Sequence, residues 1–91
     1  TPIDFVKVES LRRHMALTVA NMADFFGVSR ETYYNWLRGK RPRRRMEAIL
    51  RNKLRILFFV MTEHNWPTPD AIAAERPERY EKLLALTSHM Q

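Results

Sequence analysis

The sequence predicts an all-α fold, a small bundle of about five helices with an extended fourth helix and a C-terminal helix. Apolar residues recur three and four positions apart along most of the chain, which is the spacing of one helix face. Only two glycines occur among 91 residues and 45% of the residues are apolar, which favours helix and argues against disorder. A chain of this length makes one domain, so we expect residues 1–91 to share a single core.

A first helix is expected within residues 3–15. Phe5, Val8 and Leu11 lie near helical spacing there, and Asp4 is placed to cap or favour the helix start.

Residues 18–39 predict two short helices joined by a tight turn. Thr18 offers a helix-starting hydroxyl to a helix over roughly residues 19–26. Gly27 suits the left-handed conformation that ends a helix, and Ser29 suits the cap of the next one. Two helices joined by a short glycine-containing turn are the pattern of the DNA-binding helix-turn-helix.

The second of these helices, from Arg30 to Arg38, has two unlike sides. The side predicted to enter the core carries Thr32, Tyr33, Trp36 and Leu37. The outward, polar side carries Arg30, Glu31, Tyr34, Asn35 and Arg38. Aromatic side chains also serve as stacking platforms for single strands, but helical spacing favours core positions for Phe26, Tyr33 and Trp36.

Positive charge is concentrated between Arg30 and Arg55. Ten basic residues stand against two acidic ones there, a balance of +8 in a chain of net charge +6, so the remainder sums to −2. A phosphate backbone favours such concentration through counterion release, whereas a charge run that only confers solubility does not require it. Pro42 makes residues 40–45 a basic linker rather than a helix.

A long helix is expected from Met46 to His64. Its apolar stripe comprises Met46, Ile49, Leu50, Leu54, Leu57, Phe58 and Met61, while Ile56, Phe59 and Val60 lie off the stripe. A monomer this small has difficulty covering both faces of such a helix. Either the tail folds over the helix or another subunit covers it.

The tail is expected to break after the long helix and to end in another helix. Residues 65–70 contain two prolines, a short helical turn follows at residues 70–75, and Pro77 opens a final helix that extends to about His89. We predict that the helical region of residues 46–90 provides packing and dimerisation. The predicted dimer or partner interface is Leu54, Ile56, Leu57, Phe59, Val60, Leu83 and Leu86.

Residues 17–40 resemble the helix-turn-helix of the Cro and phage-repressor type, often called the XRE family. The match lies in register without a gap at Leu17-Thr18, Ala23, Gly27-Val28-Ser29-Arg30, Thr32, Trp36 and Arg38-Gly39-Lys40. Val19 departs from the pattern, because the family commonly places a glutamine there that supports the reading residues. The resemblance implies a cytoplasmic, bacterial or phage-encoded regulator of transcription that binds double-stranded DNA.

The resemblance also places Arg30, Glu31 and Asn35 where family members contact base edges. Their chemistry fits, because arginine pairs with guanine, asparagine with adenine, and glutamate accepts from the cytosine amino group. Tyr34 is expected outside, with its hydroxyl near a phosphate or its ring near a thymine methyl. The alternative for all four is an ordinary solvated helix face, with Glu31 only favouring the helix start.

The predicted phosphate contacts are hydroxyls and cations around the reading helix: Thr18, Ser29, Arg38, Lys40, Arg41, Arg43, Arg44 and Arg45. Arg51, Lys53 and Arg55 fit phosphate contacts and an ordinary solvent face equally well.

These features predict a repressor that occupies a palindromic operator as a homodimer. An alternative is an antitoxin or other docking protein, which would hold a toxin or another partner through Ile56, Phe59, Val60, Leu83 and Leu86, with DNA binding as autoregulation. A third is an RNA binder or recombination accessory that reuses the same helices.

Other classes of protein fit the composition less well. With no cysteine there is no disulfide framework, thiolate nucleophile or cysteine zinc site. His14, His64 and His89 lack metal-ligand spacing, and no grouping indicates nucleophilic catalysis, so we expect no enzyme and no cofactor. The longest apolar run, Ile56 to Met61, is far shorter than the about 20 residues that span a bilayer. We therefore expect a soluble cytoplasmic protein with no membrane partner.

Overall fold

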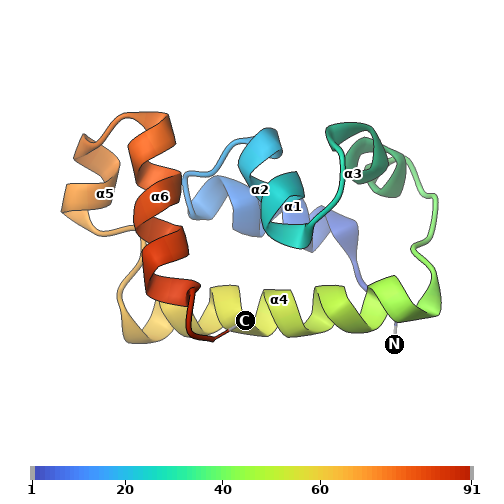
Figure 1. Ribbon diagram of the computed structural model, residues 1–91. Helices are drawn as coiled ribbons and strands as arrows, with labels where there is room; N and C mark the ends of the chain where they lie inside the picture. The colour runs from blue at the N-terminus through green and yellow to red at the C-terminus, as the bar shows by residue number, and fades with distance from the viewer. Residues whose placement is uncertain (1, 91) are drawn as a thin grey trace.

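The computed structural model describes residues 2–90, so Thr1 and Gln91 lie outside the description. Within this range the chain forms α1 (Phe5–His14), α2 (Val19–Phe26), α3 (Arg30–Leu37), α4 (Arg44–Glu63), α5 (Pro69–Ala73) and α6 (Arg76–Thr87), and no strand. The prediction of an all-α bundle with a helix-turn-helix and a long fourth helix is confirmed. Figure 1 shows α4 along one side of the molecule, with α1, α2 and α3 beside it and α5 and α6 at its carboxyl end.

Side-chain caps set the starts of the first three helices. The Asp4 carboxylate accepts from the Val6 N–H at 3.0 Å, and the Ser29 hydroxyl accepts from the Thr32 N–H at 3.1 Å. Thr18 and Asn21 form a reciprocal capping box, in which each side chain accepts from the other residue's backbone N–H. These bonds satisfy amide groups that a helix leaves unpaired at its first turn.

Gly27 ends α2 in the left-handed conformation, with φ of 77°. The amide groups of Gly27 and Val28 donate to carbonyls in the last turn of α2. A residue with a side chain is strained at this φ, which explains the glycine between the two helices. The turn that results brings α2 and α3 together, and both then pack on the core.

The core gathers side chains from every helix. Its fully buried members include Met15, Met22, Tyr33, Leu50, Leu57, Val60 and Leu83. Phe26, Tyr33 and Trp36 are all buried, so the prediction that these aromatic residues belong to the core is confirmed. The indole of Trp66, in the loop after α4, donates to the Met15 carbonyl at 2.9 Å and ties this loop to the end of α1.

The structure corrects part of the predicted apolar stripe of α4. Leu50, Leu57 and Val60 face the core, whereas Ile49 and Phe58, which the prediction placed on the apolar stripe, are exposed. The physical reason is that α4 packs against both α2 and α6, and these neighbours select which side of a helix rich in apolar residues is buried. Sequence periodicity alone left this choice open.

The predicted dimer interface is wrong for most of its members. Ile56, Leu57, Val60 and Leu83 are buried within a single chain, because α6 folds back over α4. Leu54 and Leu86 are half-buried against the same core, and Phe59 alone remains largely exposed. Of the two arrangements considered for the long helix, the tail covers it on this side.

Polar contacts hold the C-terminal region in place. The Arg79 guanidinium donates to the carbonyls of Ala71, Ile72 and Ala74 around α5, and to that of Ala16 between α1 and α2. The Tyr80 hydroxyl donates to the Asp24 carboxylate of α2 at 2.6 Å. None of the helices described is long and apolar enough to cross a membrane.

Candidate nucleic-acid interface

The buried side of α3 is fixed by aromatic contacts with α1 and α2. The Trp36 and Phe5 rings are stacked with centroids 5.5 Å apart, and the Tyr33 and Phe26 rings are 6.3 Å apart. Both α3 residues are buried, Tyr33 completely. Large rings packed on two sides leave α3 little freedom to rotate about its own axis.

A polar network reinforces this packing. The Tyr33 hydroxyl donates to Glu9 Oε2 at 2.7 Å, and Arg12 Nε donates to Glu9 Oε1 at 2.8 Å. Arg12 also donates to the Leu17 carbonyl at 2.8 Å, in the segment that leads into α2. The network therefore connects α1 to both helices of the helix-turn-helix.

The network shifts the pKa values of its members. Burial raises the pKa of the Glu9 carboxyl, but hydrogen bonds from Arg12 and Tyr33 and the nearby positive charge outweigh burial, so this pKa lies below its usual value. Burial and the hydrogen bond to Glu9 raise the pKa of the Tyr33 hydroxyl. Near neutral pH the network consists of a carboxylate, a guanidinium and a neutral phenol.

The outward side of α3 is open to solvent. Arg30, Glu31, Tyr34 and Arg38 are exposed, and α3 packs on α1 and α2 rather than beneath the C-terminal helices. Figure 1 places α3 away from α5 and α6. Three of the four predicted reading residues, Arg30, Glu31 and Tyr34, are thus accessible on this side of α3.

Asn35 differs from the other predicted reading residues. It is half-buried, and its Oδ1 accepts from Arg38 Nη1 at 3.0 Å. Recognition of adenine uses both the oxygen and the nitrogen of the asparagine amide. Arg38 therefore occupies one of the two lone pairs of the oxygen that a base would use, which leaves the second lone pair and the amide nitrogen of Asn35 for adenine.

The hydroxyls predicted to touch phosphate already serve as caps. The Thr18 oxygen accepts from an amide of α2, and the Ser29 oxygen accepts from α3 and donates to the Thr32 hydroxyl at 3.0 Å. The Ser29 hydroxyl thus donates its hydrogen bond to a residue of the same chain. Its main role in this structure is to begin α3, and a phosphate would compete with Thr32 for it.

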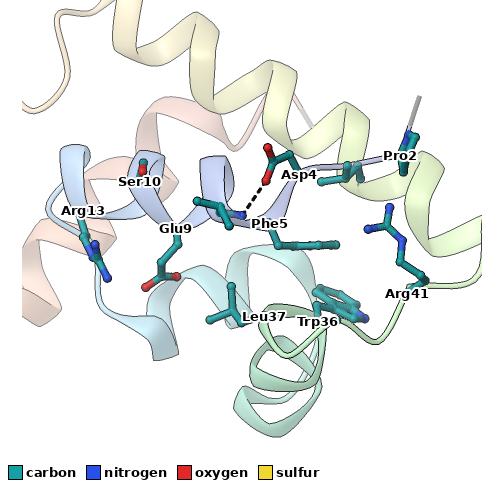
Figure 2. Close-up of a pocket in the computed structure, with 12 residues that line it drawn as sticks. Pro2, Asp4, Phe5, Glu9, Ser10, Arg13, Trp36, Leu37 and Arg41 are labelled. Atoms are coloured by element: carbon teal, nitrogen blue, oxygen red, sulfur yellow. Dashed lines mark hydrogen bonds between the residues drawn. The ribbon is translucent and has the colours of Figure 1, made fainter.

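The basic linker lies directly beside α3. Lys40, Arg41, Arg43, Arg44 and Arg45 are exposed. The linker predicted over residues 40–45 is shorter than expected, because Arg44 and Arg45 already form the first turn of α4. The Arg41 guanidinium lies over the Phe5 ring, 5.9 Å from its centroid, which holds the linker against α1. Figure 2 shows Phe5, Trp36 and Arg41 together along one pocket, with Glu9 and Arg13 at its other end.

The three cations whose role the sequence left open lie in different settings. Arg51 is bonded to Glu47 at 2.7 Å, and Lys53 lies over the Phe25 ring at 5.2 Å, so each has a contact within the chain. Arg55 is exposed on the outward side of α4. This distribution gives Arg51 an ion pair on the surface of α4 and Lys53 a half-buried packing role against α2.

Sequence reasoning missed Glu9 and Arg12 as supports of the site. Neither belongs to a motif, and the partner Tyr33 lies 24 positions from Glu9 in the chain. Between residues 2 and 90 no three histidine or acidic side chains gather closely enough to hold a metal ion.

No protein-family model matches the chain, and neither does any curated protein or solved structure with which it was compared. The resemblance of residues 17–40 to the Cro type therefore stays a prediction. The geometry of α3 and the charges beside it are the features that bear on function.

Proposed function

We propose that this chain is a sequence-specific regulator of transcription that binds double-stranded DNA by placing α3 in the major groove. One observation carries the proposal: α3 is fixed on its buried side by Phe5, Phe26 and Glu9, while its polar side is exposed. The major groove of B-DNA, about 12 Å wide, admits one α-helix. A rigid helix with an accessible polar side is the element that such binding requires.

The charges beside α3 support this geometry. Exposed cations follow it along the linker at Lys40, Arg41 and Arg43, and continue into α4 at Arg44 and Arg45. Cations next to a reading helix lie along the phosphate backbone, where they fix the register of the helix and supply affinity.

Base recognition would use Asn35 near the end of α3 and Arg30 at its start. In the free protein Asn35 accepts a hydrogen bond from Arg38. On DNA, Asn35 pairs with adenine through its amide nitrogen and the second lone pair of Oδ1, Arg38 contacts a phosphate, and Arg30 reads guanine from the first turn. Glu31 accepts from a cytosine amino group or favours the helix start.

A single reading helix contacts only a few base pairs. Useful specificity then requires two copies on half-sites about one helical turn apart, that is, on one face of the duplex. A bound dimer would block a promoter, which makes repression the simplest action for a chain of this size.

Competition between nucleic acids tests the proposal. A labelled duplex DNA bound by the chain should be displaced by duplex DNA and far less by duplex RNA, because the deep, narrow major groove of RNA cannot admit α3. Single strands should also compete weakly, because they offer no major groove to α3. Equal displacement by all three would leave only a general attraction to phosphate and would contradict the proposal.

A further inference from the structure

Two adjacent aromatic side chains of α4 remain exposed after the chain has folded. Phe58 is 51% and Phe59 48% exposed, although Leu57 and Val60 on either side of them in the sequence are buried. Phe58 also lines a groove between α1 and α4 together with Leu54. Two large exposed apolar side chains next to each other favour a site of interaction over ordinary surface.

The residues around Phe59 form a regular row. Arg55, Phe59 and Glu63 are spaced by four positions on α4, so they lie along one ridge of the helix, and all three are exposed. Neither Arg55 nor Glu63 forms an ion pair with another residue between 2 and 90. The ridge therefore presents a cation, an aromatic ring and an anion in order, with the ring at its centre.

We propose that a second copy of this chain docks on the ridge, with the two α4 helices antiparallel and crossing at Phe59. A two-fold axis at Phe59 places Arg55 of each copy opposite Glu63 of the other and brings the two aromatic rings together. A parallel arrangement would instead oppose like charges at both positions. The self-complementary order of the ridge thus identifies both the partner and its direction.

The same arrangement separates the basic ends of α4. Arg44 lies 15 positions before Phe59, so the two copies of Arg44 would be roughly 45 Å apart along the paired helices at 1.5 Å per residue. Strong repulsion between the linkers is thereby avoided. Figure 1 shows α3 at this end of α4, so the reading helices would also be well separated. Their use of two half-sites rests on the proposed function, whereas the self-association does not.

Sedimentation of the full chain without DNA tests the inference. The wild-type chain should be a dimer at micromolar concentrations, and Phe59→Asp should be a monomer. Arg55→Glu or Glu63→Arg alone should each weaken the dimer about tenfold, because each places like charges together at two symmetric positions. The double variant Arg55→Glu/Glu63→Arg should restore the wild-type dissociation constant, because it reverses both charges of each pair.

Ile72→Asp is the matched control, since Ile72 is exposed to the same 48% as Phe59 but lies on α5. It should leave the dimer unchanged, and circular dichroism should show that every variant retains its helices. A wild-type chain that stays monomeric at roughly 100 µM would overturn the inference. A double variant that dimerises no more tightly than the single variants would also overturn it. So would a ridge that binds a different protein but no second copy of this chain. Binding of the monomer to a single half-site would survive those results, so the proposed function is tested separately.

Discussion

The hydroxyl of Tyr33, on the buried side of α3, donates a hydrogen bond of 2.7 Å to the carboxylate of Glu9 in α1. Its neighbour Tyr34 has the same chemistry but stands on the exposed side of the same helix. The two phenol groups are therefore expected to serve different purposes, one in holding α3 and the other in contacting a ligand.

Replacing each tyrosine by phenylalanine should separate these purposes. Tyr33→Phe removes a hydrogen bond to a charged group and should lower the free energy of unfolding by about 1–2 kcal/mol. Tyr34→Phe should change that free energy by less than about 0.5 kcal/mol and should weaken DNA binding instead. Urea denaturation and binding titrations measure the two effects. Equal destabilisation by both variants would contradict the assignment.

The stability supplied by Glu9 should depend on pH. Its pKa is lowered in the folded chain, from a usual value of 4.5, so its contribution is fully present above pH 4.5 and is lost as the pH falls through the folded value. Glu9→Gln should therefore be less stable than wild type at neutral pH, and the difference should shrink below pH 4.5. Denaturation at several pH values checks this. A difference in unfolding free energy between wild type and Glu9→Gln that stays constant down to about pH 3 would exclude this dependence of stability on the ionisation of Glu9.

The turn between α2 and α3 should depend on the backbone of Gly27. A Cβ at this position would meet no atom within 4 Å, so a substitution is opposed by the positive φ alone. We expect Gly27→Ala to lower the free energy of unfolding by about 1 kcal/mol, and Gly27→Asn to cost less, because asparagine tolerates this conformation better. Thermal unfolding of both variants measures the two losses of stability. Asparagine as costly as alanine would point to a steric cause.

Base-reading and phosphate-binding residues should differ in their effect on sequence discrimination. Asn35→Ala should weaken binding by about 1–3 kcal/mol on the preferred site and far less on random DNA. Arg44→Ala should weaken binding equally on both, since Arg44 is expected to contact only the backbone. Titration of each variant against both duplexes provides the comparison. If Asn35→Ala lowered the affinity equally for the preferred site and for random DNA, Asn35 would be a contact without sequence preference.

The affinity for DNA should fall steeply with salt. If each subunit neutralises about four phosphates, a dimer contacts about eight, and the log-log slope of affinity against salt should be near −7. Titrations between low and physiological salt measure this slope. A value near zero would remove the electrostatic part of the proposal.

Local chemistry made the helix-turn-helix predictable. The helix expected at residues 19–26 is α2 itself, because Thr18 and Gly27 fix its ends through interactions with near neighbours. The inner and outer sides of α3 followed from helical spacing for the same reason. Both features depend on residues within a few positions of one another.

Contacts between distant segments were not predictable in this way. The sequence of α4 is apolar on several sides, and only its packing against α2 and α6 decides that Val60 is buried and Phe59 exposed. The bonds from Arg79 to Ala16 and from Tyr33 to Glu9 join residues far apart in the chain and carry no local signal. For this reason the predicted interface needed correction, whereas the exposure of Arg30, Glu31 and Tyr34 agrees with the spacing along α3.

Selection of bound sequences from a random pool of duplex DNA tests the central claim most directly. The account predicts enrichment of a palindrome whose half-sites lie about one helical turn apart, or a multiple of it, and whose preferred bases change when Asn35 is replaced. A pool that shows no enriched sequence after repeated selection would contradict the claim that α3 reads DNA.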